Sequence, residues 1–116
     1  MTRHDPREAL RQMLDHAREA RDLAAGSSRD KLHQDRLLQL ATIQLLQILG
    51  EAANRVPKAV RERQPTIPWS DITGIRNRLI HGYDTVDFDI LWQIVVQDLP
   101  PLIATLERTL PPTNSR

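Results

Sequence analysis

The fold is decided by residues 37–49, LLQLATIQLLQIL. Apolar residues fill nine of these thirteen positions, and we expect the segment to lie within one long helix from about Asp30 to Val56. A helix that is apolar nearly all round is either buried at the centre of a domain or shared with another subunit. The segment therefore predicts a central helix or one at a subunit interface.

The overall composition favours the same helical class. The chain has 116 residues, of which 40% are hydrophobic and only 3% aromatic. A core of Leu, Ile, Val and Ala suits the seams between packed helices, and this length fits one domain. We expect a single all-α domain over residues 1–116, with 113–116 as a disordered tail.

Capping residues and prolines indicate where the other helices begin and end. Asp5 is suited to be the N-cap of a first helix, with Pro6 in its first turn and Gly26 at its end. Asp87 is suited to cap the last helix in the same way. We expect further helices near residues 58–63, 69–80 and 88–110, a loop at 82–86, and a kink or break at Pro100-Pro101.

Charge and cysteine content exclude several classes of protein. The formal net charge is +1, so the chain lacks the strong basic field of a non-specific nucleic-acid-binding protein. The absence of cysteine excludes disulfides and thiolate metal sites. No apolar run approaches the roughly 20 residues of a membrane span, and we expect a soluble, cytoplasmic protein.

Candidate chemistry gathers in residues 76–83, RNRLIHGY. His81 is the one histidine that follows an apolar pair, and Arg76 and the single tyrosine, Tyr83, lie close to it in sequence. Imidazole can accept or donate a proton near neutral pH, and a guanidinium can stabilise charge that grows on a phosphate. This combination suits RNA cleavage, because the ribose 2′-OH supplies the nucleophile and no metal is needed.

Helical spacing tests whether these side chains can meet. On an ideal helix Arg76 and His81 lie about 140° apart, whereas Asn77 and His81 share a face. A two-fold dimer would bring two such helix ends together into one cleft. The structural alternative stays open, because a histidine at a helix C-terminus interacts well with the helix dipole and a lone tyrosine usually serves packing.

Landmarks on both sides of this motif resemble a known family. They are Ile48-Leu49-Gly50-Glu51-Ala52-Ala53-Asn54-Arg55, Ile67-Pro68-Trp69, residues 72–83, Val86-Asp87, Leu91-Trp92 and Leu99-Pro100-Pro101-Leu102. Residues 48–102 resemble the HepT-like branch of the HEPN superfamily, a helical toxin paired with a minimal nucleotidyltransferase antitoxin. The family signature Arg-x4-His-x-Tyr is matched by Arg76, His81 and Tyr83.

The resemblance implies an up-and-down bundle of four to five helices that dimerises, with the two motifs lining a cleft at the interface. It implies endoribonuclease activity without a metal or other cofactor, with Arg76 and His81 catalytic and Asn77 supporting them. It also implies that the partner nucleotidyltransferase uses ATP to transfer AMP to Tyr83, which neutralises the toxin. Glu51 is a candidate hydrogen-bond partner of Arg76.

The sequence departs from the family pattern at one position. Many relatives carry a larger or acidic residue where this chain has Gly82, which leaves the position of Tyr83 open.

Two other functions stay open beside the ribonuclease. The chain would alternatively be a non-catalytic helical scaffold that binds a nucleotidyltransferase, or a module that holds a nucleotide without cleaving RNA. The nucleotide module is disfavoured, because the sequence has no Gly-rich phosphate loop of the P-loop or Rossmann type.

Overall fold

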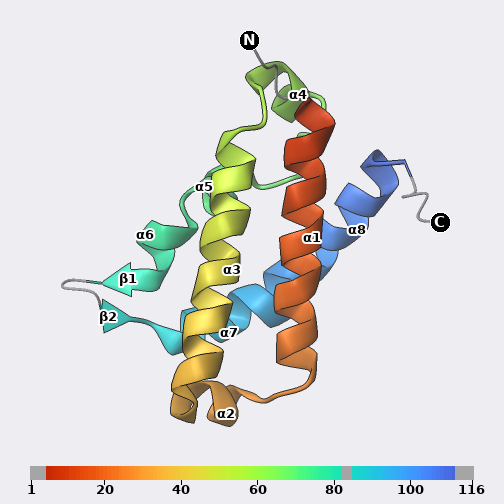
Figure 1. The fold of residues 1–116 in the computed structure, drawn as a ribbon. Coiled ribbons are helices and arrows are strands. Elements are labelled where there is room, and N and C mark those ends of the chain that lie inside the picture. Colours follow the sequence, from red (N-terminus) through yellow and green to blue (C-terminus); the bar gives the residue numbers. More distant parts are fainter. Residues whose placement is uncertain (1–4, 82–84, 112–116) are drawn as a thin grey trace.

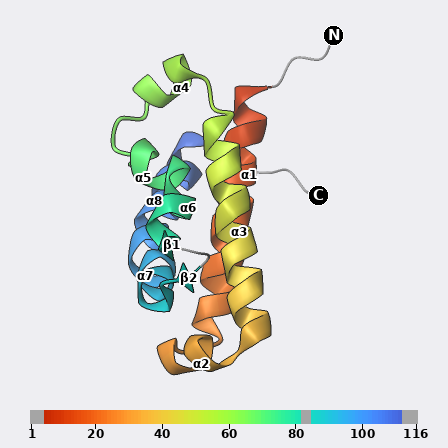
Figure 2. The same cartoon turned by 90° about the vertical axis from the view of Figure 1, so that its left-hand side faces the viewer.

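Two long antiparallel helices, α1 (Pro6–Ala25) and α3 (Arg36–Asn54), lie side by side along the length of the molecule (Figures 1 and 2). The structure is a computed structural model that describes residues 5–81 and 85–111, with the backbone alone at His81. The remaining elements are α2 (Arg29–Gln34), α4 (Lys58–Glu62), α5 (Trp69–Thr73), α6 (Ile75–Leu79), β1 (Ile80–His81), β2 (Thr85–Val86), α7 (Phe88–Gln93), a π-helical turn η1 (Ile94–Asp98) and α8 (Leu99–Thr109). The predicted all-α class is confirmed.

Helix α1 begins and ends where its capping residues predict. The Asp5 carboxylate accepts a hydrogen bond from the Arg7 N–H at 2.9 Å, Pro6 occupies the first turn, and Gly26 follows the last residue. The buried side of α1 is apolar and includes Leu10, Met13, Leu14, Ala17 and Ala20.

The predicted single helix over residues 30–56 is wrong, because the chain breaks at Asp35. This residue is extended, with φ −108° and ψ 106°, and its carboxylate accepts the Leu38 N–H at 3.1 Å. A short polar side chain that satisfies the free N–H groups of a new helix favours this break over a continuous helix. The same hydrogen bond lowers the pKa of the Asp35 carboxyl below its usual range.

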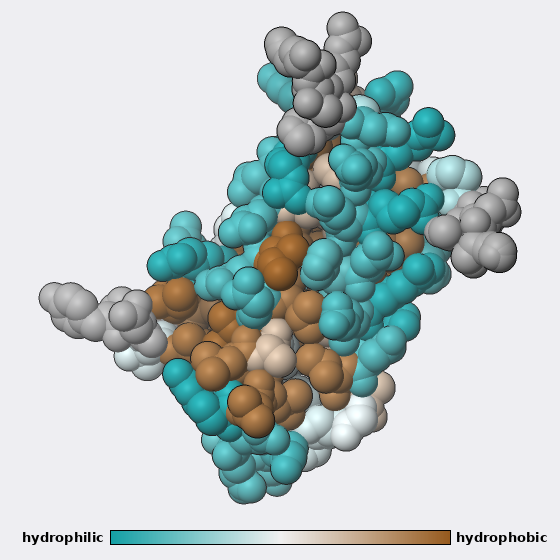
Figure 3. Space-filling view, viewed as in Figure 1, coloured by the Kyte–Doolittle hydropathy of each residue, from teal (hydrophilic) through white to brown (hydrophobic). Residues whose placement is uncertain are grey.

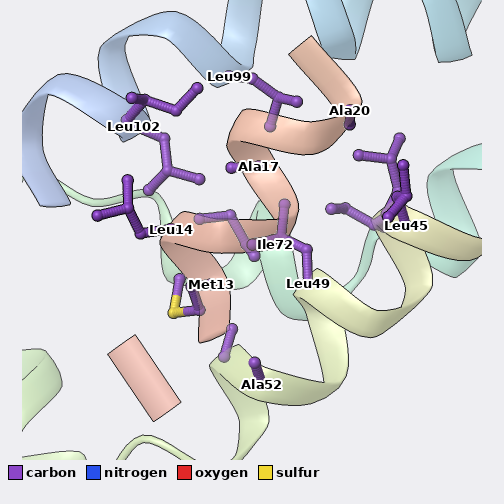
Figure 4. Close-up of a cluster of buried hydrophobic side chains, with 14 of the residues drawn as sticks. Met13, Leu14, Ala17, Ala20, Leu45, Leu49, Ala52, Ile72, Leu99 and Leu102 are labelled. Carbon is purple, nitrogen blue, oxygen red and sulfur yellow. The ribbon is translucent and has the colours of Figure 1, made fainter. Parts of the chain in front are cut away.

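The core lies where α1 and α3 meet α5 and α8 (Figure 4). Met13 of α1 and Leu49 of α3 are completely buried there, and Ile72 of α5 and Leu102 of α8 are nearly so. Gly50 allows α5 to approach α3 closely, because a Cβ at this position would lie 3.0 Å from the Ile72 carbonyl oxygen.

The predicted helix over residues 69–80 is also wrong as one unit, because Gly74 divides it into α5 and α6. The Gly74 backbone leaves helical geometry at φ −97° and ψ 16°. Upstream, Trp69 is fixed at the start of α5, since its indole N–H donates to the carbonyls of Arg61 and Gln64. Two short helices of different direction therefore replace one longer helix (Figure 1).

Two short strands, β1 and β2, follow α6, so Ile80 is not helical and residues 85 and 86 are not loop as predicted. Residues 82–84 of the predicted loop lie outside the described residues. Ile80 and His81 pair antiparallel with Val86 and Thr85, and the Asp87 N–H donates to the Leu79 carbonyl at 2.9 Å. The β-branched residues in both strands suit this extended geometry.

The last helical segment starts at Asp87, as predicted, because its carboxylate accepts the N–H groups of Asp89 and Ile90. The predicted kink or break at Pro100-Pro101 is not found at the prolines themselves, which both lie in the first turn of α8. The α-helical pattern is instead interrupted just before them, by the π-helical turn η1. Proline lacks an N–H, so this pair cannot serve the carbonyls four residues earlier. The predicted tail at 113–116 lies outside the described residues.

We predict that Asp35→Ala lowers the melting temperature at neutral pH by removing the cap of α3. The pKa of Asp35 is lowered in the folded state, so its stabilising contribution is present above the ordinary carboxyl value of 3.8 and is lost as the pH falls through the lowered value. The difference between variant and wild type should therefore shrink in thermal unfolding at about pH 2.5. Asp15→Ala is the control, because Asp15 is exposed and has no hydrogen bond or ion pair with the described residues. An equal effect of the two variants at neutral pH would contradict this account.

Candidate functional site

Helix α6 presents two of the predicted site residues to solvent. Ile75 and Leu79, four positions apart, are buried against the core, and this fixes which side of the helix faces inward. Arg76 and Asn77 are exposed on the outer side. Within the described part of the chain, the Arg76 side chain has no hydrogen bond or ion pair, so its guanidinium is free to meet an anion.

His81 belongs to β1 and not to the helix that holds Arg76. Its backbone pairs with Thr85 of β2, because the chain leaves the helix after Leu79. The predicted angular relations on one helix, including a face shared by Asn77 and His81, are therefore wrong. The His81 side chain and all of Tyr83 lie outside the described residues.

Glu51 is exposed on α3, and its predicted hydrogen bond to Arg76 does not occur among the described contacts. That prediction assumed that Glu51 was buried beside the motif. The exposure removes the low-dielectric setting in which such a pair would be strongest.

Arg78 makes a contact that the sequence did not predict. Its Nη2 lies 3.0 Å from an Asp98 carboxylate oxygen, which joins α6 to η1. The two residues are 20 positions apart, so no local pattern indicates the pair. It occupies the edge of a groove of about 390 Å³, which lies between α5 and α6 on one side and η1 and α8 on the other.

One face of α3 is apolar and exposed. Leu37 is 79% exposed, Leu40 is 47% exposed, and Ala41 lies beside them on the same face. We call these three residues the α3 apolar face. Figure 3 shows apolar atoms over the half of α3 that contains this face and extending toward the hairpin of β1 and β2. Thus the predicted apolar helix is buried on one side only.

The best-defined charge cluster of the described residues lies between α2 and α7. The Asp89 carboxylate accepts hydrogen bonds from the Arg29 guanidinium at 2.6 and 2.9 Å, and His33 Nε2 lies 2.9 Å from it. Hydrogen bonds from Arg29 and His33 lower the pKa of Asp89, and Asp89 raises the pKa of Arg29. These contacts join two elements of the fold and do not include the Arg76 motif.

The described part of the chain has neither a candidate membrane-spanning helix nor a candidate metal cluster. None of its helices combines the length and apolar character needed to cross a membrane. The described side chains contain no group of three or more His, Cys, Asp or Glu residues placed to hold a metal ion.

The chain is similar in sequence to known proteins over a region that includes the candidate site residues. A family model described as "Ribonuclease HepT-like" matches residues 13–109. A Methanocaldococcus jannaschii protein named "Putative RNase MJ1380" is 30% identical over 107 residues, which are 92% of this chain and 98% of that protein. A Thermococcus cleftensis protein named "Probable ribonuclease HepT" is 38% identical over 74 residues, 64% of this chain and 67% of that protein. No solved structure gives a significant match.

Proposed function

Since the chain belongs to the HepT-like ribonuclease family, we propose that it is a metal-independent endoribonuclease with Arg76 and His81 as its catalytic residues. The observation that carries this proposal is the exposed Arg76 guanidinium, which has no partner among the described residues and precedes the β1 histidine by five positions. A guanidinium with no partner among the described residues is available to a phosphate.

The reaction uses the nucleophile of the RNA itself. His81 accepts the proton of a ribose 2′-OH, and the 2′ oxygen attacks the adjacent phosphorus. The bond from phosphorus to the 5′ oxygen breaks, and the protonated His81 imidazole returns its proton to that leaving oxygen. Arg76 stabilises the added negative charge on the phosphate, and Asn77 orients His81 or the phosphate. The products are a 2′,3′-cyclic phosphate and a free 5′-OH.

The working form is a homodimer that covers the α3 apolar face. Leu37 is too exposed to contribute to the core of its own chain, and contiguous apolar surface of this kind is typical of an interface between proteins. A two-fold pairing through α3 would bring both hairpins toward one cleft, because the apolar surface extends in their direction (Figure 3).

Activity is controlled by a cognate minimal nucleotidyltransferase antitoxin. The Tyr83 hydroxyl oxygen attacks the α-phosphorus of ATP, the bond to the β-phosphate breaks, and pyrophosphate leaves as the tyrosine loses its proton. The AMP that remains on Tyr83 adds negative charge two residues from His81 and repels the RNA backbone. Together these steps make the chain the toxin of a toxin–antitoxin pair.

We predict that Arg76→Ala and His81→Ala each lower the rate of RNA cleavage about 100-fold or more, because each removes a group that acts on the reacting phosphate. Cleavage is measured by gel on total RNA with EDTA present, and circular dichroism checks that the variants fold. Arg63→Ala is the matched control, because Arg63 is an exposed arginine on which no hydrogen bond or ion pair with the described residues depends. If the folded variants show the same rate of RNA cleavage as wild type, the result would contradict these catalytic roles and favour the non-catalytic scaffold. Mononucleotide binding without RNA cleavage would favour the nucleotide module.

Co-expression with the partner nucleotidyltransferase should increase the mass of the chain by one or more AMP units, and Tyr83→Phe should abolish the increase. Intact-mass spectrometry measures the change, and RNA cleavage should fall as the modified fraction rises. Modification that persists in Tyr83→Phe would assign the AMP to another residue and refute this control step.

The substitution Leu37→Glu should convert the dimer into a monomer, because it places a charge within the α3 apolar face. Sedimentation velocity measures the oligomeric state. Ala59→Glu is the control, because Ala59 is an exposed apolar residue on α4, near the other end of α3 (Figure 1). A monomeric wild type, or a Leu37→Glu variant that still dimerises, would show that this face is not the interface.

A further inference from the structure

The π-helical turn determines where Asp98 lies. In a continuous α-helix Asp98 would follow Leu91 by two turns and would fall on the same buried stripe. In the turn, the Leu99 N–H donates to the Ile94 carbonyl five residues earlier, which widens the helix by about one residue. Leu99 takes the buried position at 2% exposed, and Asp98 is displaced to the exposed flank.

From this flank Asp98 holds Arg78 across the groove between α6 and η1. The base of the groove is apolar and includes Leu49, Ile72 and Leu102. The ion pair between Arg78 and Asp98 is the one hydrogen-bonded link, among the described residues, from α5 or α6 to η1 or α8. This ion pair is therefore the polar contact that holds the groove side of α6 to η1.

Helix α6 needs such contacts because it has only five residues. A helix this short is not stable alone and takes its direction from tertiary packing. Ile75 and Leu79 hold its inner side, while Arg78 holds the side next to the groove. Because Arg76 lies two positions before Arg78, roughly half a turn away, rotation of α6 about its axis would move the Arg76 guanidinium.

We propose that Asp98 is a positioning residue for RNA cleavage: by holding Arg78, it fixes the rotation of α6 and so directs Arg76 toward the scissile phosphate. The proposal rests on the ribonuclease function given above. The alternative is a simpler electrostatic effect, in which the Asp98 carboxylate repels RNA and neutralises Arg78. Under this alternative, removal of the carboxylate would strengthen RNA binding and leave the rate of the chemical step unchanged.

The two effects give different values of kcat in Asp98→Asn, which keeps the size of the side chain and removes its charge. Positioning predicts that kcat falls about two- to fivefold, the effect expected of one partly exposed ion pair, while KM stays constant or falls. The melting temperature should change little. Rates are measured on one RNA that the wild type cleaves. Asp71→Asn is the matched control, because Asp71 is an exposed carboxylate of the same groove without a hydrogen bond or ion pair to the described residues.

Charge reversal sharpens this test. Asp98→Arg alone should lower kcat further, because it repels Arg78, and the double variant Arg78→Asp with Asp98→Arg should recover much of the loss. An unchanged kcat in Asp98→Asn, or a lower KM as its single effect, would overturn the proposal. Failure of the double variant to exceed Asp98→Arg would overturn it too.

Hydrogen exchange separates this proposal from the proposed function. The Arg78 N–H donates to the Gly74 carbonyl at 3.1 Å within α6, and its exchange should be faster in Asp98→Asn than in wild type. Amides of α1 should be unaffected. If the wild type cleaves no RNA but this exchange rises, the ribonuclease function fails while the control of α6 by Asp98 stands. If the exchange does not change, the positioning role fails even where RNA is cleaved.

Discussion

Helix α3 has more apolar surface than one copy of the chain covers, and the rest of the structure depends on this constraint. Its Leu46 and Leu49 are completely buried against the other helices, whereas Leu37 is mostly exposed. Burial of one side requires α1 and α5 to pack closely, which small residues such as Gly50 permit. The exposed side is the surface that the proposed dimer would cover, because water contact with large apolar side chains is unfavourable.

The proposed catalytic residues are held by short elements that depend on their neighbours. Buried Ile75 and Leu79 fix the inner side of α6, and the hairpin of β1 and β2 begins directly after it. Such elements have little stability of their own, since a short helix and a two-stranded hairpin are both marginal in isolation. Precise placement of Arg76 therefore requires contacts from distant parts of the chain, and the ion pair of Arg78 with Asp98 is one of them.

Local sequence features predicted much of the fold. Asp5 and Asp87 could be recognised as caps because an N-cap needs only one suitable side chain at a helix start. The breaks at Asp35 and Gly74 were missed because the apolar pattern continues across both. The strand at His81 and the partner of Arg78 were missed for another reason. Each depends on contacts between separate segments, and local sequence patterns do not show which segments contact each other.

We propose that the two copies of the dimer build one RNA-cleaving cleft, with Arg76 from one copy and His81 from the other acting on the same phosphate. The most direct test is a mixed dimer of Arg76→Ala and His81→Ala chains, co-expressed with different affinity tags and purified through both. The account predicts about half of the wild-type cleavage rate per dimer, because one of the two sites regains both groups. A mixed dimer as inactive as either variant alone would contradict it, since each chain would then supply both groups to its own site.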